Sequence, residues 1–398
     1  MPRGIFPVAI LFPINALAIA IMPRNKALIH ATAILACLSL AGCGVAGKDA
    51  EAGPAPRYVI ASGSAVGGDR LRAALEPLFD NAMMGETRAV LIMHGGEVVA
   101  EVYGADFGPH SKLPGWSMSK TVTAILAGMM IADGRLALDR PAPVPAWSTP
   151  GDPRGDISLR QLLMMTSGLD NHETAPDDNE DASYKSDAQR MLFLDGAADM
   201  ARYAENRPLE AAPGEVFEYS TVTTTIICDV MTRALTQSDN PAIRRDAMMS
   251  FARGRLFEPL GMHSMTPEFD ARGTMIGGMM IHATAMDWAR LGEFLRHNGA
   301  VRNAQIMPTS WPRLMKRANE KEPSFGMHLW LNRWPRRGES PLFPDRAPSS
   351  TFASLGENGQ FLIVVPDRKL TVVRLGHSPD AQSRRAVADQ LSRIIGLF

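Results

Sequence analysis

The sequence predicts an α/β protein of the α+β type, with one antiparallel sheet built from both chain ends and flanked by helices. Two observations predict it. Runs of β-favouring residues with hairpin spacing occur at residues 89–103 and again at residues 360–375. The long segment between them carries mostly helical periodicity. Strands at both ends and helices between them are most simply combined in a single sheet with a mostly helical region inserted.

The first predicted hairpin joins residues 89–93 to residues 98–103. The intervening His-Gly-Gly-Glu at 94–97 is typical of a tight turn between strands. A helical segment at about 69–80 precedes it. The second hairpin joins residues 360–365 to 370–375 through Pro-Asp-Arg-Lys, and a final helix is expected at about 379–395.

The middle of the chain shows helical spacing of apolar residues. This spacing is found at residues 119–133, 159–165, 197–205, 221–236 and 285–298. We therefore predict a sheet domain formed by residues 58–145 and 335–398, and an inserted helical domain formed by residues 146–334. Residues 171–190 are acidic and poor in apolar side chains, which is typical of a solvated loop.

The composition is that of a globular protein, with 398 residues, 45% hydrophobic and 21% charged. Lys and Arg number 41 against 42 Asp and Glu, so the formal net charge is -1. Such a balance gives no field that favours nucleic acid or an anionic membrane surface. We expect a small-molecule or short-peptide-like substrate, and the sequence gives no signal for an oligomeric state.

The amino terminus is predicted to be a secretory signal at residues 1–43, followed by a linker at 44–57 that is rich in Gly, Ala and Pro. The signal ends in Leu-Ala-Gly-Cys, which resembles the bacterial lipoprotein box. That resemblance implies cleavage before Cys43, a lipid on its sulfur, and a folded part held at the cell envelope in the periplasm. A plain signal peptide or a retained membrane anchor is the alternative. Either Met1 or Met22 can be the true start, because Met22 begins a complete signal.

Three cysteines leave no disulfide framework, because Cys37 would depart with the signal and Cys43 would carry lipid. Cys228 lies in an apolar stretch and is expected to be a buried structural thiol. No Cys and His cluster has the spacing of a metal site. The sequence predicts neither a structural metal nor a cofactor.

Ser117 and Lys120 form a Ser-x-x-Lys pattern at the start of an apolar helix. Residues three apart lie on one helix face. A serine hydroxyl becomes a good nucleophile when a neighbouring base takes its proton, and a lysine is such a base when burial lowers its pKa. The pattern alone is common by chance, so it needs support from elsewhere in the chain.

That support comes from Tyr219, which is predicted to lie in a loop directly before a helix. A phenol in that position can carry a proton between nucleophile and leaving group. The alternative is a half-buried aromatic residue whose hydroxyl caps the helix.

Several blocks resemble the serine β-lactamase-related and penicillin-binding-protein-like hydrolases. They are Ser117 to Lys120, Thr-Ser-Gly-Leu at 166–169, Pro-Leu-Gly-Met at 259–262 and the helix at 285–292. In detail the chain is similar to the class C-like branch with 6-aminohexanoate-dimer hydrolase and class C-like esterases. The likeness spans about residues 70–396. It implies a β-lactamase/transpeptidase-like fold and catalysis by Ser117, Lys120 and Tyr219.

The sequence departs from that pattern in two motifs. Class C relatives carry Tyr-x-Asn, but Thr221 stands where the Asn would be. The third motif falls at residues 354–360 and has no Lys at its head. Because a cation there normally pairs with the carboxylate of a β-lactam, good β-lactam turnover is not expected.

Four residues near the carboxyl end are predicted to bind substrate: Gly356, Glu357, Gly359 and His377. Glycine in a strand beside the nucleophile lets substrate approach the backbone, and one N–H there would join that of Ser117 in an oxyanion hole. The alternatives are a bulge or turn for the glycines and an ordinary surface position for His377.

These observations together predict a serine hydrolase that cleaves an ester or amide bond through an acyl-enzyme on Ser117. A β-lactamase or D,D-peptidase acting on cell-wall-like substrates is the alternative within enzymes. A non-catalytic envelope lipoprotein that binds peptide in the same cleft is a further alternative.

Overall fold

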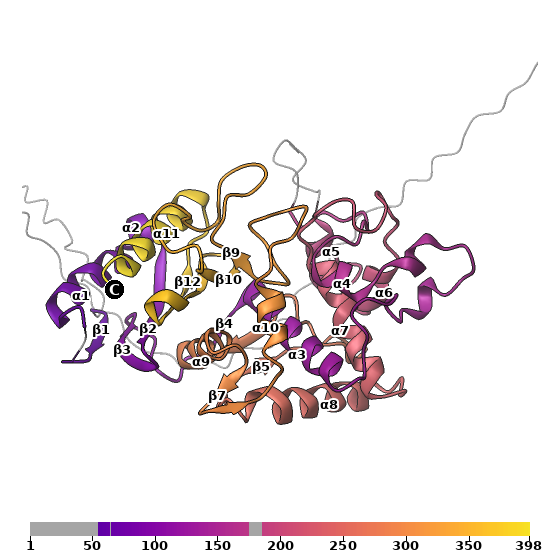
Figure 1. Ribbon diagram of the computed structural model, residues 1–398, viewed down its shortest axis with the longest axis horizontal. Helices are drawn as coiled ribbons and strands as arrows, with labels where there is room; N and C mark the ends of the chain where they lie inside the picture. Colours follow the sequence, from indigo (N-terminus) through magenta and orange to yellow (C-terminus); the bar gives the residue numbers. More distant parts are fainter. Residues whose placement is uncertain (1–54, 64, 175–184) are drawn as a thin grey trace, which may run out of the picture. The chain divides into compact units, whose positions relative to one another are not determined.

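One seven-stranded sheet joins the two ends of the chain (Figure 1). The computed structural model describes residues 55–63, 65–174 and 185–398, so Cys43 and the predicted signal lie outside the described residues. Along the sheet the strands are β1 (Arg57–Ile60), β3 (Glu97–Tyr103), β2 (Glu86–His94), β12 (Leu370–His377), β11 (Gln360–Val365), β10 (Phe352–Gly356) and β9 (Trp330–Leu331). All neighbours are antiparallel, and the predicted α+β architecture is confirmed.

The pairing of β2 with β12 brings the two predicted hairpins together. Their register runs from His94 opposite Leu370 to Glu86 opposite His377, with one irregularity at residues 375–376. The β2–β3 turn uses Gly95 and Gly96, whose φ angles of 63° and 93° lie where glycine is the favoured residue. The sheet is therefore continuous although its strands come from distant parts of the sequence.

Helices cover both faces of the sheet. Alternate side chains point to opposite faces, so Ile92 and Val372 pack with Leu391 on the side of α1 (Gly68–Leu75) and α11 (Ala381–Ile395). Leu91 packs on the other side, in the cluster that contains the residues of α9 (Ala285–Arg296). Both faces are buried in apolar contacts.

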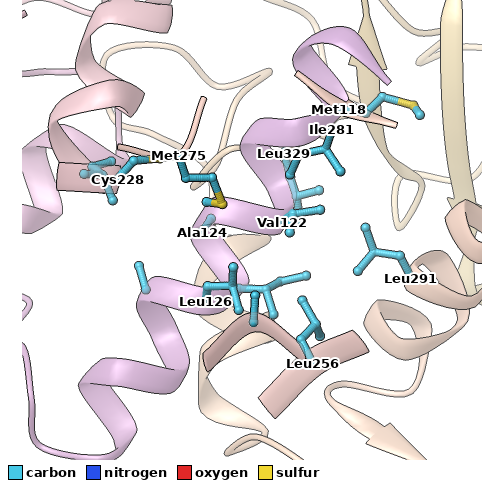
Figure 2. Close-up of a cluster of buried hydrophobic side chains, with 14 of the residues drawn as sticks. Met118, Val122, Ala124, Leu126, Cys228, Leu256, Met275, Ile281, Leu291 and Leu329 are labelled. Carbon is cyan, nitrogen blue, oxygen red and sulfur yellow. The ribbon is translucent and has the colours of Figure 1, made fainter. Parts of the chain in front are cut away.

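The centre of the helical part is α3 (Ser119–Ala132), whose residues 119–130 are all buried. Figure 2 shows Val122 and Leu126 of this helix among side chains from several other segments, including Leu256. Cys228 of α7 (Thr221–Leu235) lies in the same core and is a buried free thiol. Because α3 is enclosed on all sides, the groups at its start are held in place relative to both the sheet and the surrounding helices.

The remaining elements are shorter or lie around this core, except that α2 packs on α11 and β2. The helices are α2 (Asn81–Met84), α4 (Leu159–Leu163), α5 (Asp187–Phe193), α6 (Met200–Glu205), α8 (Pro241–Ala252) and α10 (Ser310–Met315). The short strands are β4 (Leu113–Pro114), β5 (Thr266–Pro267), β6 (Ile281–Ala283), β7 (Ala300–Val301) and β8 (Ala304–Gln305). Within the described residues, no helix combines the length and the apolar character needed to cross a bilayer.

Two elements inside the predicted helical domain belong to the sheet layer. β9 is the last strand of the sheet, and α9 packs on β2, β11 and β12. The described residues, from 55 to 398, form one compact unit. The predicted boundary after residue 334 therefore does not coincide with the edge of the sheet, and the division into two domains stays a prediction.

Candidate active site

The backbone before Ser117 is tightly constrained. Gly115 donates its N–H to the Ile281 carbonyl at 2.9 Å, and a Cβ on Gly115 would lie 2.2 Å from the Trp288 ring. Trp116 follows with a φ of 48°. This left-handed backbone conformation has a cost in free energy for any residue other than glycine. The turn presents the partly exposed Ser117 at the entrance to α3.

Lys120 lies one turn further along and is 1% exposed. Its Nζ lies 3.1 Å from Ser117 Oγ, 2.7 Å from Thr221 Oγ1 and 3.0 Å from the Gly278 carbonyl oxygen. Burial lowers the pKa of this amine, and the Glu173 carboxylate, 3.7 Å from Nζ, partly opposes that shift. The geometry suits both protonation states. An ammonium donates to all three oxygens, whereas a neutral amine donates to two and accepts the Ser117 proton with its lone pair.

Glu173 holds the start of α7 against Lys120. Its carboxylate accepts the Thr221 N–H at 2.6 Å and the Thr221 hydroxyl at 2.5 Å. The result is a connected chain of hydrogen bonds from Ser117 through Lys120 and Thr221 to Glu173. The sequence had placed Glu173 in a solvated acidic loop, yet its side chain is only 17% exposed. That interpretation is wrong for this residue.

Tyr219 completes the group. Its side chain lines the same cleft as Ser117 and Lys120, and its ring centroid lies 4.8 Å from Lys120 Nζ. Burial, reinforced by the Glu173 charge, raises the pKa of Tyr219 well above its usual value, so the phenol carries its proton at neutral pH. The side chain that caps α7 belongs to Ser220, so the Tyr219 hydroxyl has no capping role.

Aromatic side chains enclose the cleft. The ring of Trp330 lies 5.4 Å from that of Tyr219, and Phe325 meets Tyr219 edge-on at 5.8 Å. Apolar walls exclude water and strengthen the electrostatic interactions inside. The cleft is lined by Ser117, Lys120, Tyr219, Phe325, His328, Trp330, Ser354 and Leu355.

The edge of β10 has no strand partner at Leu355, a residue that lines the same cleft as Ser117. The Asn332 N–H bonds the Thr351 carbonyl at 3.0 Å, and Ala353 pairs with Trp330, so backbone groups of alternate residues from Thr351 face β9. Leu355 is the next in this series. β9 provides no partner for it because the strand begins only at Trp330.

Gly356 explains how β10 comes close to the turn at Gly115 that precedes Ser117. A Cβ on Gly356 would lie 2.2 Å from the Gly115 carbonyl oxygen, so only glycine permits the approach. The N–H groups of Ser117 and Leu355 are therefore the two candidate donors of an oxyanion hole. The sequence had assigned the second donor to the same strand without identifying the residue.

Comparison with known proteins places the chain in a family. A model of the family described as Beta-lactamase matches residues 78–396. The protein belongs to the Beta-lactamase family. This confirms the resemblance inferred from the motifs.

Individual relatives of this Beta-lactamase family protein are hydrolases or penicillin-binding proteins. It is 22% identical over 309 residues to the 6-aminohexanoate-dimer hydrolase of Paenarthrobacter ureafaciens, covering 75% of this chain and 74% of that one. Its fold is similar to that of EstCE1, a hydrolase with promiscuous acyltransferase activity, with a TM-score of 0.61, 18% identity and coverage of 82% and 98%. It is also similar to a penicillin-binding protein homologue from Caulobacter crescentus, with a TM-score of 0.56, 19% identity and coverage of 81% and 96%.

The other sequence-predicted residues of this Beta-lactamase family protein lie outside the cleft. Glu357 and Gly359 are in the turn between β10 and β11, where Gly359 has a φ of 77° and its carbonyl accepts from Arg374 at 2.8 Å. Glu357 lies 3.6 Å from Arg384 and adds to the rise in the pKa of Tyr219. His377 is exposed at the end of β12. The substrate-binding roles of Gly356, Glu357, Gly359 and His377 stay predictions.

Sequence reasoning missed four contributors to the site: Thr221, Glu173, the Gly278 carbonyl and His328. Thr221 was noted only because the Beta-lactamase relatives of class C carry Asn there. That position was itself a signal, since a polar side chain two residues after Tyr219 reaches Lys120. For the other three, no local pattern marked a position in the site.

Titratable side chains in the part of the chain that the structure describes do not group as metal ligands. No three or more His, Cys, Asp or Glu residues there are placed so that they could hold a metal ion.

Proposed function

We propose that this protein is a serine hydrolase that cleaves an ester or amide bond through an acyl-enzyme on Ser117. The observation that carries the proposal is the 3.1 Å contact between Lys120 Nζ and Ser117 Oγ, with the amine buried and Tyr219 lining the same cleft. Burial favours the uncharged amine, which a general base requires.

Acylation starts with proton transfer from Ser117 Oγ to Lys120 Nζ as Oγ attacks the substrate carbonyl carbon. The carbonyl oxygen becomes an oxyanion, which the N–H groups of Ser117 and Leu355 stabilise. The new ammonium donates to Thr221 Oγ1 and the Gly278 carbonyl, both already within 3.0 Å. The proton thus enters a site that has acceptors for it.

Collapse of this intermediate breaks the bond to the leaving group, which needs a proton. Tyr219 carries its proton at neutral pH and adjoins Ser117, so it donates to the leaving oxygen or nitrogen and is reprotonated from Lys120. A water molecule then attacks the acyl-enzyme by the same steps, releasing the acid and restoring Ser117.

The walls of the cleft favour uncharged esters and linear amides. Among the described residues that line it, Lys120 is the one cation, and its Nζ is already bonded to three oxygens. A substrate carboxylate next to the reacting bond would lack a partner there, and an unpaired buried charge is costly. The names of the 6-aminohexanoate-dimer hydrolase and of EstCE1 agree with amide or ester cleavage.

A β-lactamase or D,D-peptidase is the second candidate. The likeness to the Caulobacter crescentus penicillin-binding protein homologue favours it. A fluorescent penicillin that labels Ser117 and is then released would support this candidate. A non-catalytic binding lipoprotein is disfavoured, because binding alone does not require Ser117, Lys120 and Tyr219 together.

We also infer export and lipid attachment at Cys43, which would hold the hydrolase at the bacterial cell envelope with its cleft in the periplasm. The Leu-Ala-Gly-Cys sequence at 40–43 supports this inference. Labelling of cells with a radioactive or clickable fatty acid should modify the protein, and Cys43→Ser should abolish the label.

The decisive experiment compares Ser117→Ala with Ser119→Ala in the form that begins at residue 44. Ser117→Ala should lower turnover of a chromogenic ester by about a thousandfold or more while the melting temperature is kept. Ser119→Ala is the matched control, because the Ser119 hydroxyl accepts from the Ile281 N–H at 3.1 Å and does not contact Lys120. Unchanged turnover by a folded Ser117→Ala protein would refute the proposal.

A further inference from the structure

His328 is a buried histidine with an unfavourable backbone conformation beside the catalytic group. It lies between α10 and β9, is 3% exposed, and lines the same cleft as Ser117. Its φ of 55° is in the left-handed region, where a side chain costs free energy unless the surroundings fix it. Because backbone strain tends to cluster at active sites, a strained residue in this cleft calls for a functional explanation.

The left-handed backbone by itself does not explain a histidine. Asn298, Asn303 and Asn358 have φ angles of 52°, 66° and 58°, and asparagine tolerates this region better than most residues. Histidine is also found in this region more often than most residues, so the backbone alone does not decide between histidine and asparagine. The contacts of the imidazole show what the ring adds.

The ring makes one polar contact through each nitrogen. Nδ1 lies 2.9 Å from the Leu163 carbonyl oxygen at the end of α4 and must donate, because a carbonyl only accepts. Burial lowers the pKa of His328 to about 3, so the ring is neutral and Nε2 is an acceptor. Thr224 Oγ1 lies 3.1 Å from Nε2 and supplies the hydroxyl proton.

The backbone of His328 bonds a third element. Its carbonyl accepts from the Thr121 hydroxyl at 2.8 Å, and Thr121 directly follows Lys120 on α3. Thr224 lies one turn into α7, three residues after Thr221. Its single hydroxyl proton is shared between His328 Nε2 and the Ser220 carbonyl oxygen at 3.2 Å, because both of these groups accept. His328 thus connects α3, α4 and the first turn of α7 close to Lys120 and Tyr219, which lie at the starts of α3 and α7.

We propose that His328 is a positioning residue, which holds the start of α7, with Tyr219 and Thr221, in register with Ser117 and Lys120. The inference rests on the proposed function. A small displacement of α7 would lengthen the Lys120–Thr221 contact and shift Tyr219 relative to Ser117 without emptying the cleft. The chemical step would then slow while binding of a small reactive probe would stay the same.

The test measures the rate at which a fluorophosphonate labels Ser117, using His328→Asn and Thr224→Val. Asn suits the left-handed backbone and keeps a donor for the Leu163 carbonyl, but it is too short to reach Thr224. Each variant should lower the labelling rate at saturating probe by about 10- to 100-fold, with unchanged half-saturating concentration and melting temperature. The double variant should be no slower than either single variant, because both remove the same hydrogen bond.

A matched control separates this role from relief of backbone strain. Lys369 has a φ of 49° in the turn between β11 and β12, so Lys369→Gly relieves similar strain far along the chain from the catalytic residues. This variant should label at the wild-type rate. His328→Gly, which relieves strain but removes the ring, should label as slowly as His328→Asn or more slowly.

Two results overturn the inference. The first is a wild-type labelling rate in both His328→Asn and Thr224→Val, which would show that the ring positions nothing. The second is labelling that slows only in proportion to a lower melting temperature, which would show a purely structural role. If His328→Asn folds poorly, Thr224→Val alone decides, since it removes a single hydroxyl. If the wild-type protein itself is not labelled at Ser117, the proposed function is wrong. This result differs from failure of the inference, in which the wild-type protein is labelled and the variants are labelled equally fast.

Discussion

Thr221 should contribute to catalysis through the proton that Lys120 gains. Its hydroxyl accepts from Lys120 Nζ at 2.7 Å and donates to Glu173 at 2.5 Å. Thr221→Val keeps the shape of the side chain but removes both hydrogen bonds. We therefore expect the amine to lose its shortest contact with little change in packing.

The size of the effect follows from the charge on Lys120. A hydrogen bond from a neutral amine contributes about 0.5–1.5 kcal/mol, whereas one from the ammonium that forms in the transition state contributes about 1.5–3 kcal/mol. The difference of about 1–1.5 kcal/mol stabilises the transition state selectively. It corresponds to a loss of about 5- to 13-fold in kcat/KM for Thr221→Val.

The assay compares kcat/KM for a chromogenic ester in Thr221→Val, Thr221→Asn and Thr225→Val. The Asn amide oxygen can accept from Lys120, so Thr221→Asn should recover most of the activity. Thr225 is equally buried, but its hydroxyl bonds only the Thr221 carbonyl at 3.1 Å, so Thr225→Val is the matched control. Equal kcat/KM for Thr221→Val and Thr225→Val would refute the reasoning.

Three further predictions concern the electrostatics and packing around the site. Glu173→Gln removes the carboxylate that raises the pKa of Lys120, so the acid limb of the kcat/KM profile should move to lower pH, and an unmoved limb would contradict the contact. Burial and the neighbouring Asp229 raise the pKa of Glu205 from 4.5 to about 8, so between these values the folded state holds a proton that the unfolded state has lost. The free energy of unfolding in urea should therefore fall as the pH rises through this window, and Glu205→Gln should weaken that dependence. A Cβ on Gly128 would lie 2.1 Å from a buried indole nitrogen, so Gly128→Ala should cost about 1–3 kcal/mol of stability. Gly254→Ala, whose Cβ would meet nothing within 4 Å, should show no such loss in thermal unfolding.

Much of the fold could be predicted because its signals are local. The Gly95-Gly96 turn and the alternating residues around it specify a hairpin whatever lies elsewhere. Predicted helices at residues 119–133, 221–236 and 285–298 correspond to α3, α7 and α9 within a few residues. The two-residue strand β9 and the helix α8 were not predicted, because β9 is too short to show a period and the apolar face of α8 is weak.

The site residues likewise include some that local patterns predicted and some that they did not. Ser117 and Lys120 are one helical turn apart, so helix geometry alone brings their side chains together. Tyr219 was recognised from its motif and its likeness to a family. Glu173 and Thr221 lie in separate segments, and the acidic composition around Glu173 suggested a solvated loop rather than a buried partner of Lys120.

The sequence by itself predicted most of the elements, the family and three candidate catalytic residues, because hydrophobic period, turn chemistry and motif spacing act over a few residues. Only the tertiary structure decided that Glu173, Thr221 and His328 surround Lys120. Their partners are 48 to 207 residues away along the chain. Contacts over such separations depend on how the buried helices and the sheet pack, and no local pattern of residues records that packing.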